Sequence, residues 1–286
     1  MSDATNDAPL ARRREAGAFL RSRRGRLAPS DVGLSQGFRR RTPGLRREEV
    51  AILAGVGTTW YTWLEQGREI QPSNEVLSAL AEVLRLDPAE RHHLFALYDR
   101  PTPKRRLPGE ERVGEPLRHM VDGLAGQPAF VLGRRWDILT WNRAAEFVIG
   151  PYSGLDGSRP NVLDLLFSDP ARRLFVDWEN VARGALATFR ADCAPYIGDP
   201  DFESVVGRLG RLNPEFAAWW PHHDVAHRLA GTKRLNHSTV GRMHFAFSML
   251  AVGDQRGMKL FVFTPVDEED TPRKLSRLLG QPNPFA

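Results

Sequence analysis

Apolar residues recur every three or four positions through the first hundred residues, which is the period of amphipathic helices. One such run follows a start signal at 72–74. Another start signal at 87–90 combines an N-cap aspartate, a proline and a glutamate. With a basic helix at 17–24 and two short helices within 46–67, the pattern predicts about five helices in this part of the chain.

The most informative stretch is 46–67, where the two short helices are separated by a tight turn at Gly55. Gly67 is expected to end the second helix as a C-cap. This is the spacing of a helix-turn-helix, whose second helix reads the major groove of DNA. The residues expected to be buried are Val50, Leu53, Ala54, Tyr61 and Leu64.

On a 3.6-residue wheel, the second helix turns several polar and aromatic side chains outward. An outward Trp63 is unusual unless it meets a partner. The sequence pattern continues in register through four helices and resembles the Cro/repressor-type helix-turn-helix domain. The alternative interpretation is a helical bundle that binds no ligand. The candidate DNA-binding residues are Arg47, Thr58, Thr59, Trp60, Thr62, Trp63, Arg39, Arg40 and Arg41.

The second half has a mixed pattern of strands and helices. Alternating residues over 242–251 and an apolar run at 258–263 predict a closing hairpin. Two strands, several helices and this hairpin are the order of a PAS-like α+β domain, in which a sheet with a helical cover encloses a pocket. The other expected elements are strands at 128–133 and 136–141 and helices at 142–149, 162–167, 171–190, 201–212 and 214–220.

The expected organisation is an all-α helix-turn-helix domain at 11–100, a Pro- and Arg-rich linker at 101–116, and an α+β domain at 117–266. The run 267–286 is expected to be a weakly ordered tail. We expect no transmembrane span, because no run of eighteen apolar residues occurs, and no secretory signal is visible. A single cysteine, Cys193, excludes an internal disulfide and fits a reducing cytoplasm, and it is expected to be a packed or surface thiol.

Charge is divided unevenly between the two halves. Residues 1–107 hold 19 basic against 13 acidic side chains, whereas residues 108–286 hold 21 against 22. A GC-rich genome explains the preference for Arg over Lys, but not this distribution. The positive excess therefore lies where a phosphate-binding domain requires it.

The stretches 128–142, 177–179, 214–225 and 237–241, together with 44–51 upstream, resemble the MmyB-like transcriptional regulators over about residues 15–265. The resemblance implies a Cro-type helix-turn-helix joined to a PAS-like domain with an apolar cavity of fatty-acyl size. It makes several residues candidates for the ligand site. They are Trp141, Asn142, Phe167, Arg190, Trp219, His223, His237, Phe245 and Phe247, with Phe130, Leu132, Leu139 and Phe261 as further walls.

Several of these residues have a plainer interpretation. Asn142 fits a helix N-cap, and Arg190 fits a cation at a helix C-terminus as well as a clamp for a carboxylate. The aromatic candidates fit an ordinary core. His223 belongs to a histidine cluster at 222–227 that lacks an evident fourth ligand, so a metal site is not expected. His237 fits a hydrogen-bonded residue at a sheet edge better than a haem ligand.

Three classes of function compete. We favour a sequence-specific DNA-binding regulator, a homodimer on double-stranded DNA whose second domain binds a small apolar ligand. The second class is an enzyme with a DNA-binding appendage. The sequence does not support it, because it contains no glycine-rich phosphate loop, no G-x-S-x-G motif and no H-E-x-x-H motif. The third class keeps DNA binding but makes the second domain a protein-interaction or dimerisation module. We expect no cofactor and no membrane partner. The one small molecule expected is a fatty-acyl ligand.

Overall fold

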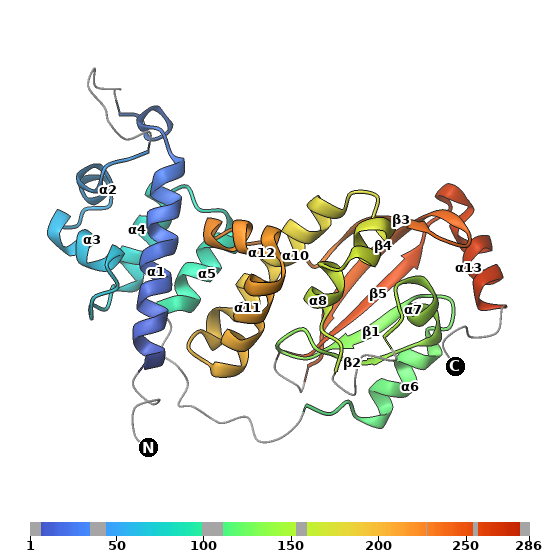
Figure 1. The fold of residues 1–286 in the computed structure, drawn as a ribbon. Coiled ribbons are helices and arrows are strands. Elements are labelled where there is room, and N and C mark those ends of the chain that lie inside the picture. Colours follow the sequence, from blue (N-terminus) through green and yellow to red (C-terminus); the bar gives the residue numbers. More distant parts are fainter. Residues whose placement is uncertain are drawn as a thin grey trace. The chain divides into compact units, whose positions relative to one another are not determined.

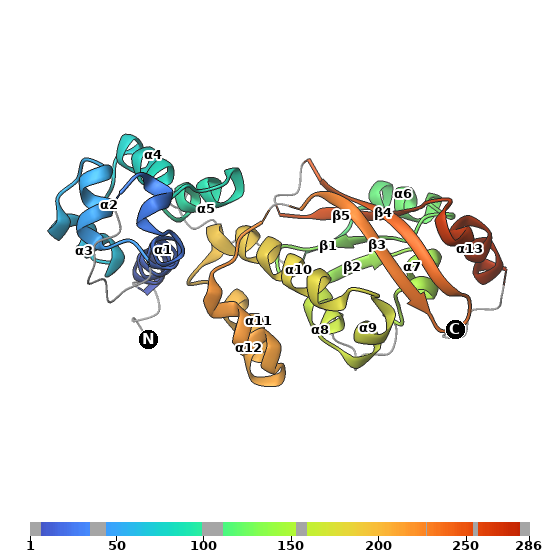
Figure 2. The same cartoon turned by 90° about the horizontal axis from the view of Figure 1, so that it is seen from above.

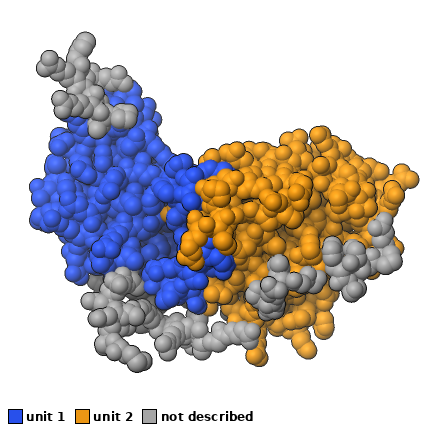
Figure 3. All heavy atoms as spheres, in the orientation of Figure 1, with its two compact units in different colours: residues 1–105, 193–208, 217–227 blue, residues 106–192, 209–216, 228–286 orange. Residues whose placement is uncertain are grey.

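The computed structural model describes residues 7–34, 44–98, 111–152, 159–226, 228–253 and 257–280 (Figure 1). The chain divides into two compact units (Figure 3). The helical unit holds residues 1–105, 193–208 and 217–227, and the sheet unit holds residues 106–192, 209–216 and 228–286. Two stretches from the second half of the sequence therefore belong to the helical unit, which the expected division at 101–116 did not anticipate.

The five helices expected in the first hundred residues are present. Local signals start several of them: the Glu49 side chain accepts from the Arg46 N–H at 2.6 Å, and Ser73 caps the fourth helix. Gly17 of the first helix faces the backbone of Glu65 so closely that no side chain would fit. The helices are α1 (Asp7–Arg26), α2 (Arg47–Leu53), α3 (Thr58–Glu65), α4 (Asn74–Val83) and α5 (Pro88–Tyr98).

The turn between α2 and α3 requires glycine. Gly55 has a φ of 68°, and Gly67, just after α3, has a φ of 70°, a region that L side chains rarely adopt. Tyr61 and Leu64 are buried as expected, as are Val50 and Ala54. The prediction for Leu53 is wrong: it is 39% exposed, because Ala51 takes the inward position of that turn instead.

The sheet unit contains one five-stranded antiparallel sheet in the order β2-β1-β5-β4-β3. The hairpin expected at the end of the sequence forms its centre, since β5 pairs with both β4 and β1. The strands are β1 (Ala129–Leu132), β2 (Ile138–Trp141), β3 (Ala230–His237), β4 (Gly241–Ala251) and β5 (Lys259–Pro265).

The two faces of this sheet are covered by different helices (Figure 2). Ala129, Val131, Leu260 and Val262 form an apolar cluster on one face with Val121 of α6 (Glu115–Gly123). Alternate residues of the same strands face the other side, toward a second group of helices. That group includes α7 (Arg143–Val148), α8 (Val162–Leu166), α9 (Asp169–Leu174) and α10 (Trp178–Cys193).

The helix expected at 171–190 is two helices, α9 and α10. Phe175 is extended and pairs with Leu235, and the Val176 N–H donates to the Arg234 carbonyl at 3.0 Å. These backbone bonds to β3 interrupt the helix. The helices expected at 201–212 and 214–220 are present as α11 (Pro200–Leu212) and α12 (Pro214–Trp219). The short helices η1 (Pro29–Val32), η2 (Ala194–Tyr196) and η3 (Trp220–His222) were not predicted as separate elements.

The expectation of weak order from Asp267 onward is wrong for most of that run. After η4 (Glu268–Asp270), α13 (Thr271–Leu279) packs against β4 and α7. Its buried side chains, Thr271, Leu275 and Leu278, stand four and three residues apart, which is one face of a helix. Residues 281–286 lie outside the described residues.

Candidate functional site

The outer face of α3 carries the expected DNA-reading side chains. Thr59 is exposed and Trp63 is 38% exposed, with the Arg68 guanidinium 5.3 Å from its ring. Thr58, Trp60 and Thr62 are half-buried, and the Thr62 hydroxyl donates to the Thr58 carbonyl at 2.8 Å. The face therefore offers hydroxyl and indole groups of the kind that contact base edges.

Arg47 is held in place by a carboxylate. Its Nε donates to the Glu65 carboxylate at 2.7 Å, and the Arg24 Nε donates to the other carboxylate oxygen at 2.6 Å. The Arg47 side chain stays 41% exposed, so part of its guanidinium is open to solvent. Burial alone would raise the pKa of Glu65, but the hydrogen bonds from Arg24 and Arg47 outweigh burial and lower it. The candidates Arg39, Arg40 and Arg41 lie outside the described residues.

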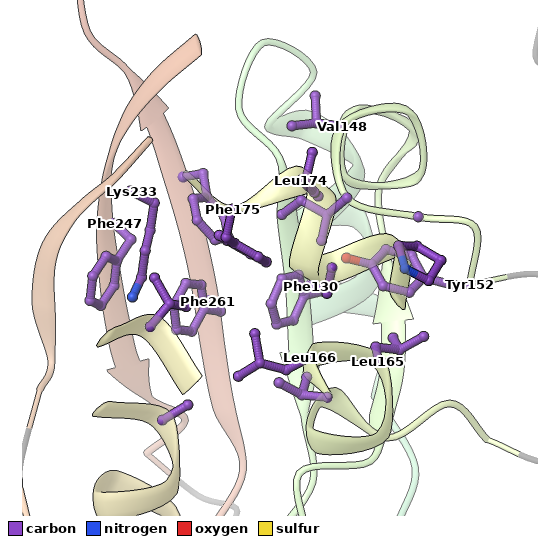
Figure 4. Close-up of a pocket in the computed structure, with 18 of the residues that line it drawn as sticks. Phe130, Val148, Tyr152, Leu165, Leu166, Leu174, Phe175, Lys233, Phe247 and Phe261 are labelled. Carbon is purple, nitrogen blue, oxygen red and sulfur yellow. The ribbon is translucent and has the colours of Figure 1, made fainter. Parts of the chain in front are cut away.

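The sheet unit contains a large cavity between the sheet and α7–α10 (Figure 4). Its volume is about 660 Å³, within the usual size range of small-molecule sites. Leu278 brings α13 to the same cavity. The side chains that form most of its wall are apolar, and they include Phe130, Leu132, Ile138, Phe147, Val148, Leu165, Leu166, Leu174, Phe175, Phe247, Met249, Phe261 and Phe263.

Three aromatic rings from neighbouring strands stack along the sheet side of the cavity. The Phe130 and Phe261 ring centroids lie 5.2 Å apart, and those of Phe261 and Phe247 lie 5.1 Å apart, each pair nearly parallel. The strand order places these residues on β1, β5 and β4, which are adjacent. The rings give the cavity one flat, rigid wall to pack against an apolar chain.

The polar side chains that line the cavity comprise cations and neutral groups, the latter including Ser168, Thr188, Asn236, Ser238 and Thr239. Arg173 and Arg228 are exposed, whereas Lys233 is half-buried. Burial lowers the pKa of Lys233 to about 8, and the charge of Arg228 adds to this effect against an opposing contribution from Asp177. The hydroxyl of Tyr152 is buried and has no hydrogen-bond partner among the described residues.

The structure brings only some of the expected ligand residues to the cavity. His237 and Phe247 line it, together with the expected walls Phe130, Leu132 and Phe261. The His237 ring also makes a 3.0 Å hydrogen bond to the Phe147 carbonyl at the end of β3. The residues that do not line it are Trp141, Phe167, Arg190 and Phe245, whereas Leu139 packs against the cluster on the opposite face of the sheet.

Asn142 forms a buried junction behind the cavity rather than part of its wall. Its carbonyl oxygen accepts from the Ala145 N–H at 2.9 Å, which is an N-cap, and from the Ala129 N–H at 3.0 Å. Its amide contacts the Leu124 and Gln127 carbonyls at 2.9 and 2.8 Å. These bonds join α7 to β1 and to the end of α6, so they account for the side chain's polar groups.

Trp219 and His223 belong to the helical unit. His223 Nδ1 lies 2.9 Å from a Glu15 carboxylate oxygen of α1, and its carbonyl accepts from Arg23. Arg26 of α1 contacts Asp224 at 2.6 Å. The segment 222–224 is thus tied to α1 by several polar bonds.

Sequence reasoning missed the cationic part of the cavity wall, above all Lys233. The strand that carries it has mostly exposed residues and only one buried residue, Leu235, so it lacks the alternation that marks a half-buried strand. β3 also contains only one β-branched residue, Thr232, so its composition does not mark a strand either.

Comparison with known families assigns both parts of the chain. Residues 113–279 match the MmyB-like transcription regulator ligand binding domain, and residues 15–94 match a helix-turn-helix domain. A comparison with curated proteins gives no match. The fold and the site define a DNA-binding regulator with a ligand-binding domain. The chain belongs to the MmyB-like transcription regulator family.

The described residues contain no group of three or more histidine, cysteine or acidic side chains placed to hold a metal ion. His227 of the expected histidine cluster lies outside the described residues. None of the helices in those ranges has the length and apolarity that a membrane crossing needs. The Cys193 side chain is buried and is not part of a disulfide.

Proposed function

We propose that this regulator binds a single-chain apolar compound of fatty-acyl size in the cavity of its sheet unit, and that this ligand changes its affinity for DNA. The observation that carries the proposal is the cavity itself, about 660 Å³ with stacked phenylalanine rings along one wall. A protein-interaction module has no need of such a space. The cavity lies within the residues that match the ligand-binding family.

The course of the chain supports a link between the cavity and the helical unit. Thr188 of α10 and Arg228 both line the cavity, and the segment between them contains residues 193–208 and 217–227 of the helical unit. A ligand that changes the position of Thr188 acts on the start of this segment, and one that changes the position of Arg228 acts on its end. Ligand binding can shift an equilibrium only if the two conformations bind the ligand differently.

On the DNA side, we propose that the exposed face of α3 reads base edges, with Thr59 and Trp63 as its central contacts. One helix-turn-helix reads a half-site, and a symmetric dimer reads two half-sites about one helical turn apart. We therefore propose a homodimer on the operator. Light scattering of the operator complex should give two chains per duplex, whereas one chain at saturating protein would contradict the dimer.

The ligand proposal is tested by thermal unfolding of the full chain with dodecanoate, dodecanol and a short-chain acid as control. The full chain is required because Leu278 near the C-terminus lines the cavity. A ligand at free concentration L that binds only the folded state stabilises it by RT ln(1 + L/Kd), so the melting temperature rises with the logarithm of the ligand concentration above Kd. The proposal predicts an increase with the long-chain compounds alone, and no shift with either would contradict it.

A further inference from the structure

The residues that line the cavity carry charge of one sign only. They include Arg173, Arg228 and Lys233, but no aspartate or glutamate. A cation beside an apolar cavity is unfavourable unless an opposite charge or hydrogen-bond acceptors compensate it. This imbalance, in a cavity lined otherwise by mostly apolar and some neutral polar side chains, points to an occupant that is apolar along most of its length and negative at one end.

Of the three cations, Lys233 is the least exposed. Arg173 and Arg228 are both exposed, and solvent screens their charges. Lys233 extends from β3 and places its Nζ 4.9 Å from the centre of the Phe247 ring. No ion pair or hydrogen bond joins this ammonium to another residue in the described part of the chain; it contacts the Phe247 ring, and the Asp177 carboxylate acts on it only at longer range.

We propose that Lys233 binds the acidic head group of the ligand, a carboxylate or a phosphate on a single alkyl chain. The inference rests on the proposed function, since it assigns a head-group site within the same cavity. An acid at this position supplies the negative charge that the wall lacks. It also gives Lys233 the charged hydrogen-bond partner that the described residues do not provide.

The position of Lys233 then fixes how the ligand lies. In Figure 4, Lys233 and Phe247 stand at one side of the cavity, and Tyr152 and Leu165 stand at the other. The head group therefore lies against Phe247 and Phe261, and the alkyl chain runs past Phe130 toward Tyr152. The Tyr152 hydroxyl is the competing position for the head group, because it is buried and lacks a partner among the described residues.

The test compares three probes that share one alkyl tail: dodecanoate, dodecyl phosphate and dodecanol. Their affinities for the full chain are measured by calorimetry for the native protein and for Lys233→Met, Lys233→Arg and Tyr152→Phe. Lys274→Met is the matched control, since Lys274 of α13 bonds the Arg242 carbonyl and does not line the cavity. Thermal unfolding without probe verifies that each variant is folded.

The inference predicts that Lys233→Met weakens binding of at least one acidic probe by about 10- to 100-fold and leaves dodecanol within about threefold. Lys233→Arg should restore most of the loss, because it keeps the charge. The acidic probe that responds identifies the head group as a carboxylate or a phosphate. Lys274→Met should change none of the affinities.

Three results would overturn the inference. Equal losses for acids and dodecanol would make Lys233 a packing residue, and unchanged acid binding would remove it from the site. A selective loss of the acids in Tyr152→Phe alone would place the head group at the other end. In each case dodecanol binding by the native protein still supports the cavity as a ligand site, whereas absence of binding by all three probes would defeat the proposed function as well.

Discussion

The Glu65 carboxylate of α3 lies 2.7 Å from Arg47 of α2 and 2.6 Å from Arg24 of α1. One buried carboxylate therefore ties α3 to both α1 and α2. Gly17, which permits close contact between α1 and the end of α3, allows this geometry. The orientation of α3 depends on charge as well as on apolar packing.

Glu65→Gln should destabilise the helical unit by about 3 kcal/mol, because Arg24 loses the partner that compensates its partly buried charge. Urea unfolding measured on this unit's tryptophans reports the change. Glu69→Gln is the matched control, since the Glu69 side chain is 87% exposed and its nearest arginine is 3.9 Å away. It should alter stability by less than about 0.5 kcal/mol.

The same pair of variants gives a test of the sign of the pH dependence. The pKa of Glu65 is lowered below its ordinary value of 4.5, so its contribution is complete above pH 4.5. The contribution is lost as the pH falls through the lowered pKa. The stability difference between the native protein and Glu65→Gln should therefore shrink in acid, and a difference that grows would contradict the ion-pair account.

Thr59→Ala and Trp63→Ala should each reduce discrimination at particular base pairs by about 1–3 kcal/mol. Arg47→Ala should weaken binding to all sequences alike and reduce the salt dependence, if its exposed part contacts a phosphate. Binding curves on single-base operator variants separate the two patterns. Glu82→Ala on the exposed side of α4 serves as a control, and an unchanged Trp63→Ala profile would remove Trp63 from the reading face.

The sequence predicted the helices of the first hundred residues well because their signals are local. Caps, a left-handed Gly55 and a 3.6-residue period each act within a few positions, and the structure confirms all five helices. The prediction that Leu53 is buried was wrong, because Ala51 takes the inward position in that turn of α2 instead. The strands β1, β2, β4 and β5 were also predicted, β4 from its alternation of apolar and polar residues and β5 from a continuous apolar run.

The cavity wall was harder to predict, because it depends on contacts between distant segments. The break at Phe175 is caused by bonds to β3, about sixty positions later in the chain. An edge strand with exposed side chains leaves no periodic signal, so Lys233 could not be assigned to the cavity. Asn142 and Arg190 were candidate polar anchors for the ligand, but neither side chain lines the cavity. Whether a side chain points into the cavity depends on how the sheet and helices pack, which the sequence does not show.

A double variant, Glu15→Gln with Asp224→Asn, should weaken the ties of segment 222–224 to α1. We expect dodecanoate affinity without DNA to stay within about twofold, since neither residue lines the cavity. The effect of the ligand on operator affinity should fall by about threefold or more, because that effect requires a connection between the sites. An undiminished effect would show that the ties to α1 do not transmit it.

Dodecanoate binding should weaken as the pH rises above about 8, where free Lys233 loses its proton. The groups around this amine are Arg228 and Asp177, with Arg173 and His237 also at the cavity or its rim. A lysine whose pKa is lowered attracts an anion below that pKa and ceases to do so above it. Dodecanol is the control probe, and equal pH profiles for the two would contradict a charged contact.

The central claim is that occupancy of the cavity changes DNA binding. The most direct measurement is the operator affinity of the full chain, on a site chosen by selection from random duplexes, with and without saturating dodecanoate. The account predicts a change of about 1–3 kcal/mol, or roughly 5- to 150-fold, together with an equal change in dodecanoate affinity when operator is bound. Identical operator affinities, under conditions where calorimetry shows the cavity filled, would contradict it.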